Sequence, residues 1–199
     1  MKLERILDFV RMQMEFQKVE RVLRVPGMPD RWENDVEHSY NLAMLGWYIV
    51  TSEKLDLDAD LVIKYGMIHD LVEVYAGDTY IYEKDPAHAA SKHEREAAAA
   101  KRLAEEFPDF PDLHQLIETY EKREDAESTF IYALDKLQPV LHIYLDDGKT
   151  WHEMGVTLAM AIENKAPKIA VSKEIEEYFN QLLVLLRERQ EELFGSITA

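Results

Sequence analysis

Histidine and carboxylate side chains that could share one metal ion occur at three separated places in the chain. His38 comes first, the adjacent pair His69-Asp70 follows 31 residues later, and Asp135 lies 65 residues beyond Asp70. Two imidazoles and two carboxylates suit Mn²⁺, Fe²⁺, Co²⁺, Ni²⁺ or Zn²⁺ and leave coordination positions for water and a phosphate oxygen. If the fold brings the three places together, the set is typical of a catalytic metal site.

The pair His69-Asp70 is a weak signal by itself. Adjacent residues of an ideal helix point about 100° apart, so one ion can contact both only near the end or flank of a helix. Glu73 strengthens the signal because it lies four residues after His69 and three after Asp70, on the same side of a helix. A carboxylate in that position could move a proton to or from water.

Apolar residues recur every three or four positions through most of the chain, which predicts amphipathic helices. Asn34 or Asp35 can cap the helix that carries His38, and Asp58 can cap the helix that carries His69. There is no convincing strand alternation, internal repeat or glycine-rich phosphate loop. The expected helices cover about 3–23, 35–51, 59–76, 88–106, 112–123, 126–145, 149–164 and 172–194.

Composition limits the classes of function. The chain has 199 residues, enough for one substantial core, and it has no cysteine, which excludes disulfides, thiolate metal sites and cysteine nucleophiles. A net charge of −16 repels polyanions, so we expect neither a nucleic-acid polymer nor an anionic membrane as a partner. Charges at Lys2, Glu4 and Arg5 interrupt any secretory signal, and no apolar run reaches about 18 residues, so we expect a cytoplasmic protein.

Three segments of the sequence resemble the HD-domain phosphohydrolases, and within them the branch of bacterial 5′-deoxynucleotidases and their eukaryotic relatives. They are residues 31–39 (RWENDVEHS), 69–78 (HDLVEVYAGD) and 126–137 (AESTFIYALDKL). Ordered blocks at compatible spacing are much more specific than the His-Asp pair alone. The resemblance extends over about residues 15–147 and implies an all-α fold, a single HD-domain bundle of about seven to nine helices covering 1–199, with the helices of 149–199 packed on its core.

The resemblance also implies roles for individual residues. The family pattern makes His38, His69, Asp70 and Asp135 the metal ligands. Glu73 matches the family glutamate that assists proton transfer, and Asp78 matches an aspartate beside the substrate. Read without the family, Asp78 could equally be only the residue that turns the chain after Gly77.

Arginines near the first block are candidates for binding phosphate. Arg24-Val25-Pro26 aligns with an Arg-Trp-Pro segment of the bacterial deoxynucleotidases, in which the arginine is expected to hold phosphate and the tryptophan to pack on deoxyribose. Val25 replaces that tryptophan here, which puts a deoxyribose preference in doubt. Arg31 is a second candidate, because a guanidinium offers a fork of donors that matches phosphate. Either arginine could instead be an ordinary surface charge.

Other polar and aromatic residues have simpler readings. Glu37 is most simply a first-turn carboxylate that favours the helix dipole. Most tyrosines recur at helical spacing and are expected in the core, but Tyr75, Tyr80 and Tyr82 flank Gly77, and one of them could line a substrate pocket. The remaining histidines match no block of the pattern and are expected to be structural or solvent-facing; they are His88, His93, His114, His142 and His152.

The expected function is metal-dependent hydrolysis of a small phosphomonoester, with a nucleoside or deoxynucleoside 5′-monophosphate as the substrate implied by the resemblance. Two alternatives stay open: an HD hydrolase acting on another phosphate ester or anhydride, and a helical module that binds a metal or nucleotide without turnover. The apolar run 182–186 exceeds what one core-facing stripe needs. It suggests a homodimer, although burial within the monomer would also explain it.

Overall fold

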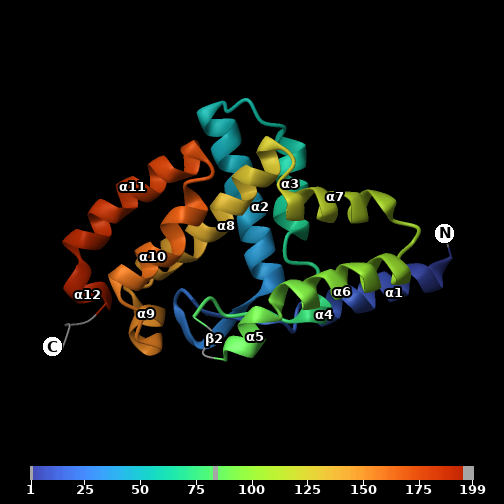
Figure 1. Cartoon of the computed structure of the whole chain (residues 1–199), viewed down its shortest axis with the longest axis horizontal. Coiled ribbons are helices and arrows are strands. Elements are labelled where there is room, and N and C mark those ends of the chain that lie inside the picture. Colours follow the sequence, from blue (N-terminus) through green and yellow to red (C-terminus); the bar gives the residue numbers. More distant parts are fainter. Residues whose placement is uncertain (1, 83–84, 195–199) are drawn as a thin grey trace.

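Helices make up most of the computed structural model, which describes residues 2–82 and 85–194 (Figure 1). One hairpin interrupts them, formed by β1 (Glu20–Val25) and β2 (Met28–Asn34). The helices are α1 (Leu3–Phe16), α2 (Asp35–Glu53), α3 (Ala59–Ile68), α4 (Glu73–Ala76), α5 (Pro86–Ala90), α6 (Lys92–Glu106), α7 (Pro111–Lys122), α8 (Ala126–Leu145), α9 (Lys149–Met154), α10 (Leu158–Ile169), α11 (Lys173–Glu188) and α12 (Gln190–Phe194).

Helices α2 and α8 lie at the centre of the fold. Helix α3 packs against both, while α10 and α11 cover another side of α8, as the orange and red ribbons of Figure 1 show. The main apolar cluster joins these elements through side chains such as Leu42, Leu134 and Leu182. A second cluster, which includes Phe16 and Leu103, joins α1, α4 and α6. The two clusters fix the helices that carry the histidines.

Side-chain caps begin the three helices on which the predicted ligands depend. The Asn34 side chain accepts a hydrogen bond from the Glu37 backbone N–H, and the Glu37 carboxylate accepts one from the Asn34 N–H, so the two form a capping box at α2. Asp125 forms a capping box with Ser128 at α8, and the Asp58 side chain caps α3 by accepting hydrogen bonds from the backbone N–H groups of Asp60 and Leu61. The predicted caps of α2 and α3 are therefore confirmed.

The prediction of an all-helical fold class is confirmed, but the hairpin was not predicted. A helix expected over 3–23 ends at Phe16, and the rest of that segment forms β1. Val19, Val22 and Val25 favour extended backbone, and Gly27, at φ 78°, allows the tight turn into β2. The apolar residues of 3–23, at mostly three- and four-residue spacing, had instead favoured one continuous helix.

Several expected helices are divided in the structure, so the helices exceed the seven to nine expected. Within the segment 59–76, α3 ends at Ile68 and a separate helix, α4, begins at Glu73. In the segment 149–164, Gly155 adopts φ 63° and ends α9. Within the described residues, no helix is long and apolar enough to cross a membrane.

Candidate metal centre and adjoining pocket

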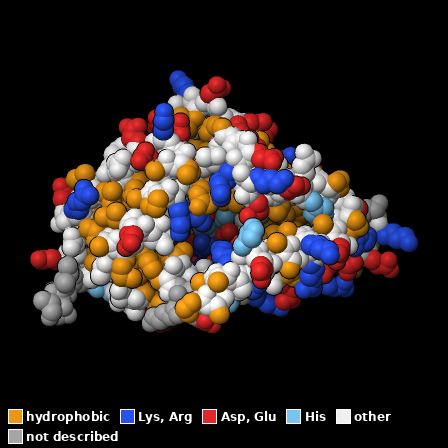
Figure 2. All heavy atoms as spheres, in the orientation of Figure 1, with side chains coloured by type: hydrophobic (Ala, Val, Ile, Leu, Met, Phe, Trp, Pro, Cys, Tyr) orange, Lys and Arg blue, Asp and Glu red, His pale blue; other side chains and the backbone are white. Residues whose placement is uncertain are grey.

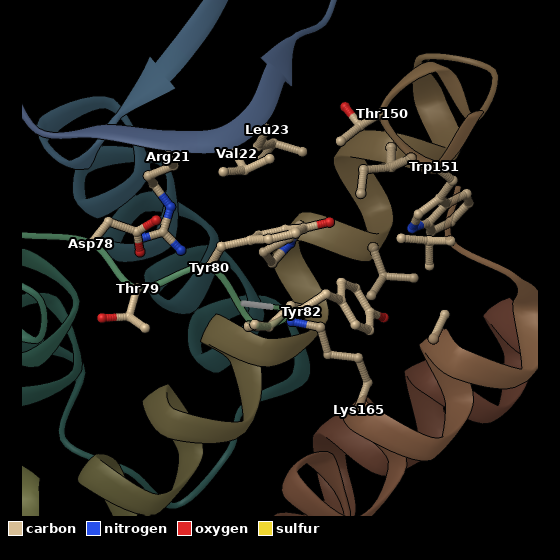
Figure 3. A pocket seen from close by; sticks show the side chains of 16 residues that line it. Arg21, Val22, Leu23, Asp78, Thr79, Tyr80, Tyr82, Thr150, Trp151 and Lys165 are labelled. Atoms are coloured by element: carbon tan, nitrogen blue, oxygen red, sulfur yellow. The ribbon is translucent and has the colours of Figure 1, made fainter. Parts of the chain in front are cut away.

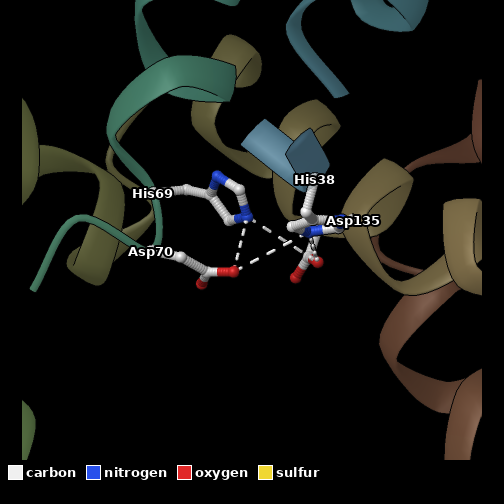
Figure 4. A group of neighbouring side chains, drawn as sticks. All are labelled: His38, His69, Asp70 and Asp135. Atoms are coloured by element: carbon white, nitrogen blue, oxygen red, sulfur yellow. Dashed lines mark hydrogen bonds and ion pairs between the residues drawn. The ribbon is translucent and has the colours of Figure 1, made fainter. Parts of the chain in front are cut away.

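The fold brings His38, His69, Asp70 and Asp135 together (Figure 4). His38 lies in the first turn of α2, His69 caps the end of α3, Asp70 follows it, and Asp135 lies in the middle of α8. One ligand atom from each residue lies within 4.8 Å of all the others. Two helix ends and one helix centre thus present two imidazoles and two carboxylates to a common point.

Short distances connect the four groups in pairs. His38 Nε2 lies 3.0 Å from Asp135 Oδ1, and His69 Nε2 lies 3.0 Å from Asp70 Oδ2. The crossed distances are longer, 3.7 Å from His38 Nε2 to Asp70 Oδ2 and 3.8 Å from His69 Nε2 to Asp135 Oδ1. The ligand atoms therefore surround one small volume.

The backbone of α3 sets the orientation of His69. Its Nδ1 lies 3.0 Å from the Gly66 carbonyl oxygen, and because a carbonyl only accepts, Nδ1 must carry the proton. The other ring nitrogen, Nε2, is buried and forms no hydrogen bond with any described residue. A lone pair without a hydrogen bond, facing two carboxylates, is the arrangement that a bound cation would satisfy.

The charge states of His38, Asp70 and Asp135 also suit a cation, whereas Asp70 and Asp135 outweigh burial and raise the pKa of His69. Burial and the nearby Arg21 guanidinium lower the pKa of His38 to about 4, against the opposing effect of Asp135, so this imidazole is neutral at pH 7. Burial raises the pKa of Asp70, but His69 and Arg21 outweigh it and hold the value well below normal. Neutral imidazole and ionised carboxylate are the forms that bind divalent ions. The donor set therefore fits the metals predicted from the sequence.

Glu73 lies buried beside this cluster, at the start of α4. Burial first, and then the charges of Asp70, Asp78 and Asp35, raise its pKa well above the usual value. Its Oε1 is 3.7 Å from Lys92 Nζ, while Oε2 has no hydrogen-bond partner among the described residues. Glu73 is thus a carboxyl group that can bind a proton at a higher pH than an ordinary carboxyl group.

A pocket opens next to the cluster, and Asp78 lies on its wall (Figure 3). Tyr80 and Tyr82 also line it, with ring centroids 5.5 Å apart, so two of the three tyrosines considered from the sequence face the pocket. Tyr75 instead donates a hydrogen bond to Glu106. Burial raises the pKa of Asp78, as does the charge of Asp70, although Arg21 opposes the shift.

Arg21 joins the pocket to the metal cluster, and sequence reasoning missed it. Its Nη1 lies 2.6 Å from Asp70 Oδ2 and 3.2 Å from Asp35 Oδ1, and its side chain lines the pocket. Asp35 is fully buried, and a second possible ligand group consists of Asp35, Asp70 and Glu73. Reading 3–23 as one helix hid Arg21, because Arg21 belongs to β1, whose pairing with β2 the sequence did not predict.

Arg24 and Arg31, the two arginines singled out from the sequence, lie elsewhere. The Arg24 guanidinium stacks 3.5 Å above the Trp32 ring and pairs with Glu153 at 3.0 Å. Arg31 pairs with Glu37 at 2.6 Å on an exposed surface. Neither is among the residues that line the pocket.

Glu33 is a further buried carboxylate that the sequence did not mark. Its Oε2 lies 3.8 Å from His38 Nδ1 and its Oε1 lies 3.5 Å from His142 Nδ1. Burial raises the pKa of Glu33, but His142 and His38 have the larger opposite effect. The pKa is therefore lowered overall, and the group is ionised. Glu33 therefore lies between His38 and His142, without a hydrogen bond from either Nδ1 atom.

Comparison with known proteins agrees with this geometry. A model of the HD domain family matches residues 16–177. The 5′-deoxynucleotidases HDDC2 of Bos taurus and Homo sapiens are 29% and 28% identical to the chain over 138 residues, which is 68% of this chain and 65% of each relative. The chain thus aligns with just under two thirds of the length of these relatives.

Two solved structures are similar in fold. One is described as a predicted metal-dependent phosphohydrolase from Magnetospirillum magnetotacticum; it is 34% identical, with a TM-score of 0.77, over 96% of this chain and 95% of that one. The other, a conserved hypothetical protein from Pyrococcus furiosus, is 19% identical with a TM-score of 0.61 over 92% of this chain and 99% of that one, and shows the fold alone.

Proposed function

The chain belongs to the HD domain family, and on that premise we propose that it is a metal-dependent phosphohydrolase that releases phosphate from a nucleoside or deoxynucleoside 5′-monophosphate. The observation that carries this proposal is the convergence of His38, His69, Asp70 and Asp135 beside a pocket. These four residues would hold one divalent ion of the Mn²⁺, Co²⁺, Fe²⁺, Ni²⁺ or Zn²⁺ class. Such an ion lowers the pKa of water and polarises a phosphoryl oxygen.

The chain's own residues supply proton transfer and charge. Glu73 would take a proton from the attacking water, a role that its raised pKa and its position beside Asp70 support. Asp78 would orient that water or a sugar hydroxyl from the pocket wall. Arg21 would offset the negative charge of the non-bridging oxygens. We assign this last role to Arg21 rather than to Arg24 or Arg31 because only Arg21 lines the pocket.

The pocket supports a nucleotide as the substrate. Its cavity has a volume of about 80 Å³ and is partly open to solvent, so only part of a nucleotide would fit inside it. Tyr80, Tyr82 and Trp151 give it aromatic surface on which a base can stack. The names of the bovine and human relatives point to the same substrate class.

Phosphate release from a panel of substrates tests this function. The panel contains ribonucleoside and deoxyribonucleoside 5′-monophosphates, a 3′-monophosphate, a nucleoside diphosphate and a phosphodiester. We expect 5′-monophosphates to be hydrolysed best, with activity lost on chelation and restored by Mn²⁺ or Co²⁺. Turnover that survives chelation, or that is unchanged in His69→Ala, would exclude the mechanism. Metal binding without turnover of any substrate would favour a binding module.

We also propose that residues 1–199 form one domain. Helix α8 carries Asp135 and packs against α2 on one side and against α10 and α11 on others. Side chains of all four helices belong to the same apolar cluster. A single cooperative unfolding transition, identical by circular dichroism and by tryptophan fluorescence, is the expected result.

A homodimer is the assembly that we propose for the chain. Of the apolar run 182–186, the structure buries Leu182, Leu183 and Leu186 but leaves Val184 and Leu185 52% and 42% exposed. Tyr40, Trp47 and Tyr48 are exposed along one stripe of α2. Sedimentation equilibrium is expected to give twice the monomer mass, and a monomer at micromolar concentration would contradict the proposal.

A further inference from the structure

Lys165 is a buried lysine that forms no pair with any described residue. It lies in the middle of α10, its side chain is 6% exposed, and no described residue forms a hydrogen bond or ion pair with its ammonium group. Lysine is almost never buried to this extent unless its charge is paired. The side chain lines the pocket next to the metal cluster, and Figure 3 shows it extending from α10 toward Tyr82.

The groups around Lys165 make its charge less favourable. Burial lowers the pKa of Lys165 to about 7, and the positive charges of Lys136, Lys168 and Arg21 lower it as well, while Asp135 acts in the opposite direction. Two of the three nearby cations are already engaged, because Lys136 pairs with Asp135 and Arg21 with Asp70. Lys165 is therefore a cation of the pocket that no described carboxylate contacts directly, although Asp78 lines the same pocket.

Lys165, Lys136, Lys168 and Arg21 lie close together in a chain whose net charge is −16. Figure 2 shows Lys and Arg side chains gathered around a hollow at the centre of the visible face. A neutral acceptor, such as a base carbonyl, would not offset repulsion among cations, whereas a phosphate dianion would. The chemistry at Lys165 thus favours an anion over a neutral polar group.

We propose that Lys165 is a phosphate-binding residue of the pocket, whose ammonium group donates hydrogen bonds to the phosphate of the substrate and of the product. The identity of the organic part of the substrate rests on the function proposed above, but the binding of phosphate does not. Helix α10 lies beyond the sequence blocks that suggested the site. Under this proposal the C-terminal helices contribute to recognition as well as to packing.

Two variants of α10 test the role. Lys165→Met keeps the length of the side chain and removes its charge. Lys168→Met is the matched control, because Lys168 lies one turn further along the helix, donates a hydrogen bond to Asn164 and does not line the pocket. Calorimetric titration with inorganic phosphate, on chelated and on Mn²⁺-loaded protein, measures binding. Thermal unfolding without phosphate measures stability.

The expected result separates a binding role from a structural one. Lys165→Met should weaken phosphate binding about tenfold or more, since a charge-assisted hydrogen bond is lost, while Lys168→Met should change it less than about threefold. Without phosphate, Lys165→Met should unfold at the same or a higher temperature than the wild type, because an unpaired buried charge is removed. Lys165→Arg should restore part of the affinity.

Three outcomes would overturn the inference: wild-type protein that binds no phosphate in either form, phosphate affinity unchanged in Lys165→Met, or equal losses in both variants. Failure of the proposed function looks different. If the wild type hydrolyses no monoester but binds phosphate through Lys165, the inference stands and the function fails. If the wild type hydrolyses monoesters and Lys165→Met binds phosphate normally, the inference alone fails.

Discussion

Arg21 Nη1 lies 2.6 Å from Asp70 Oδ2, so a strand residue and a metal-cluster carboxylate are joined across 49 positions of the sequence. Through this contact β1 supplies a positive charge where the pocket meets the cluster. The guanidinium is placed both to balance the cluster's carboxylates and to meet an incoming anion.

Replacement of Arg21 should weaken substrate binding selectively. Arg21→Gln is expected to raise KM for a 5′-monophosphate about tenfold or more, because a charged donor to phosphate is lost. Arg24→Gln is the matched control and should change KM less than about threefold, since Arg24 contacts Trp32 and Glu153 instead. Steady-state kinetics of both variants measure the effect. A larger KM effect from Arg24 would contradict the assignment.

Replacement of Glu73 should separate proton transfer from metal binding. Glu73→Gln preserves size and hydrogen bonding but cannot accept a proton, so kcat should fall about 10²- to 10⁴-fold. The metal content, measured by mass spectrometry after dialysis, should stay at the wild-type value. A variant with normal kcat would remove Glu73 from the mechanism, and one that loses the metal would make it a ligand.

Gly66 should be intolerant of a side chain. A Cβ at Gly66 would lie 2.7 Å from Ala43 Cα and 2.9 Å from its backbone nitrogen, so α2 and α3 would have to separate. We expect Gly66→Ala to lower the free energy of unfolding by about 1 to 3 kcal/mol. It should also weaken metal binding, because the Gly66 carbonyl orients His69. Lys64→Ala, an exposed change in the same helix, should stay within about 0.5 kcal/mol of the wild type.

Local sequence signals predicted much of this fold. Helix α8 has the predicted bounds, and the caps Asn34 and Asp58 begin α2 and α3 as expected, because capping and apolar periodicity depend on neighbouring residues. The family pattern selected four residues that the structure brings within ligand distance of one another. The hairpin was missed because the apolar residues of 3–23, Val19 and Leu23 among them, fit the stripe of a single helix.

Neither local sequence signals nor the family pattern identified four further residues of the site, which are Arg21, Glu33, Asp35 and Lys165. Each depends on tertiary placement. Arg21 depends on the pairing of β1, Glu33 on the return of β2 beside His38, Asp35 on its contact with Arg21, and Lys165 on the packing of α10 against α8. A single charged residue in a polar stretch gives no sign that folding will bury it. Burial without a partner, visible only in three dimensions, is the signal that separates Lys165 from the other lysines.

The hydrogen bond from Tyr65 to Asp125 should make stability depend on pH. Tyr65 Oη donates to Asp125 Oδ2 at 2.5 Å; burial raises the pKa of Asp125, but the hydrogen bonds from Tyr65 and Ser128 lower it overall. A carboxyl whose pKa is lowered on folding stabilises the protein above its unfolded pKa of about 3.9, and this contribution is lost as pH falls through the folded value.

Tyr65→Phe should therefore lower the free energy of unfolding by about 1 kcal/mol at pH 7, and the deficit should shrink below about pH 4. Urea unfolding of both proteins at pH 7 and pH 3 measures it. Lys64→Ala, an exposed change in the same helix, is the control and should stay within about 0.5 kcal/mol of the wild type at either pH. A deficit that grows on acidification would contradict the assigned role of Asp125.

The central claim is that His38, His69, Asp70 and Asp135 hold one divalent ion. Its most direct test is the Mn²⁺ or Co²⁺ affinity and stoichiometry of the wild type and of Asp135→Asn, measured by calorimetric titration after chelation, with the exposed Asp112→Asn as control. We predict one ion per chain in the wild type and the control, and an affinity at least about 100-fold weaker in Asp135→Asn. An Asp135→Asn protein that binds one ion with wild-type affinity would contradict the account.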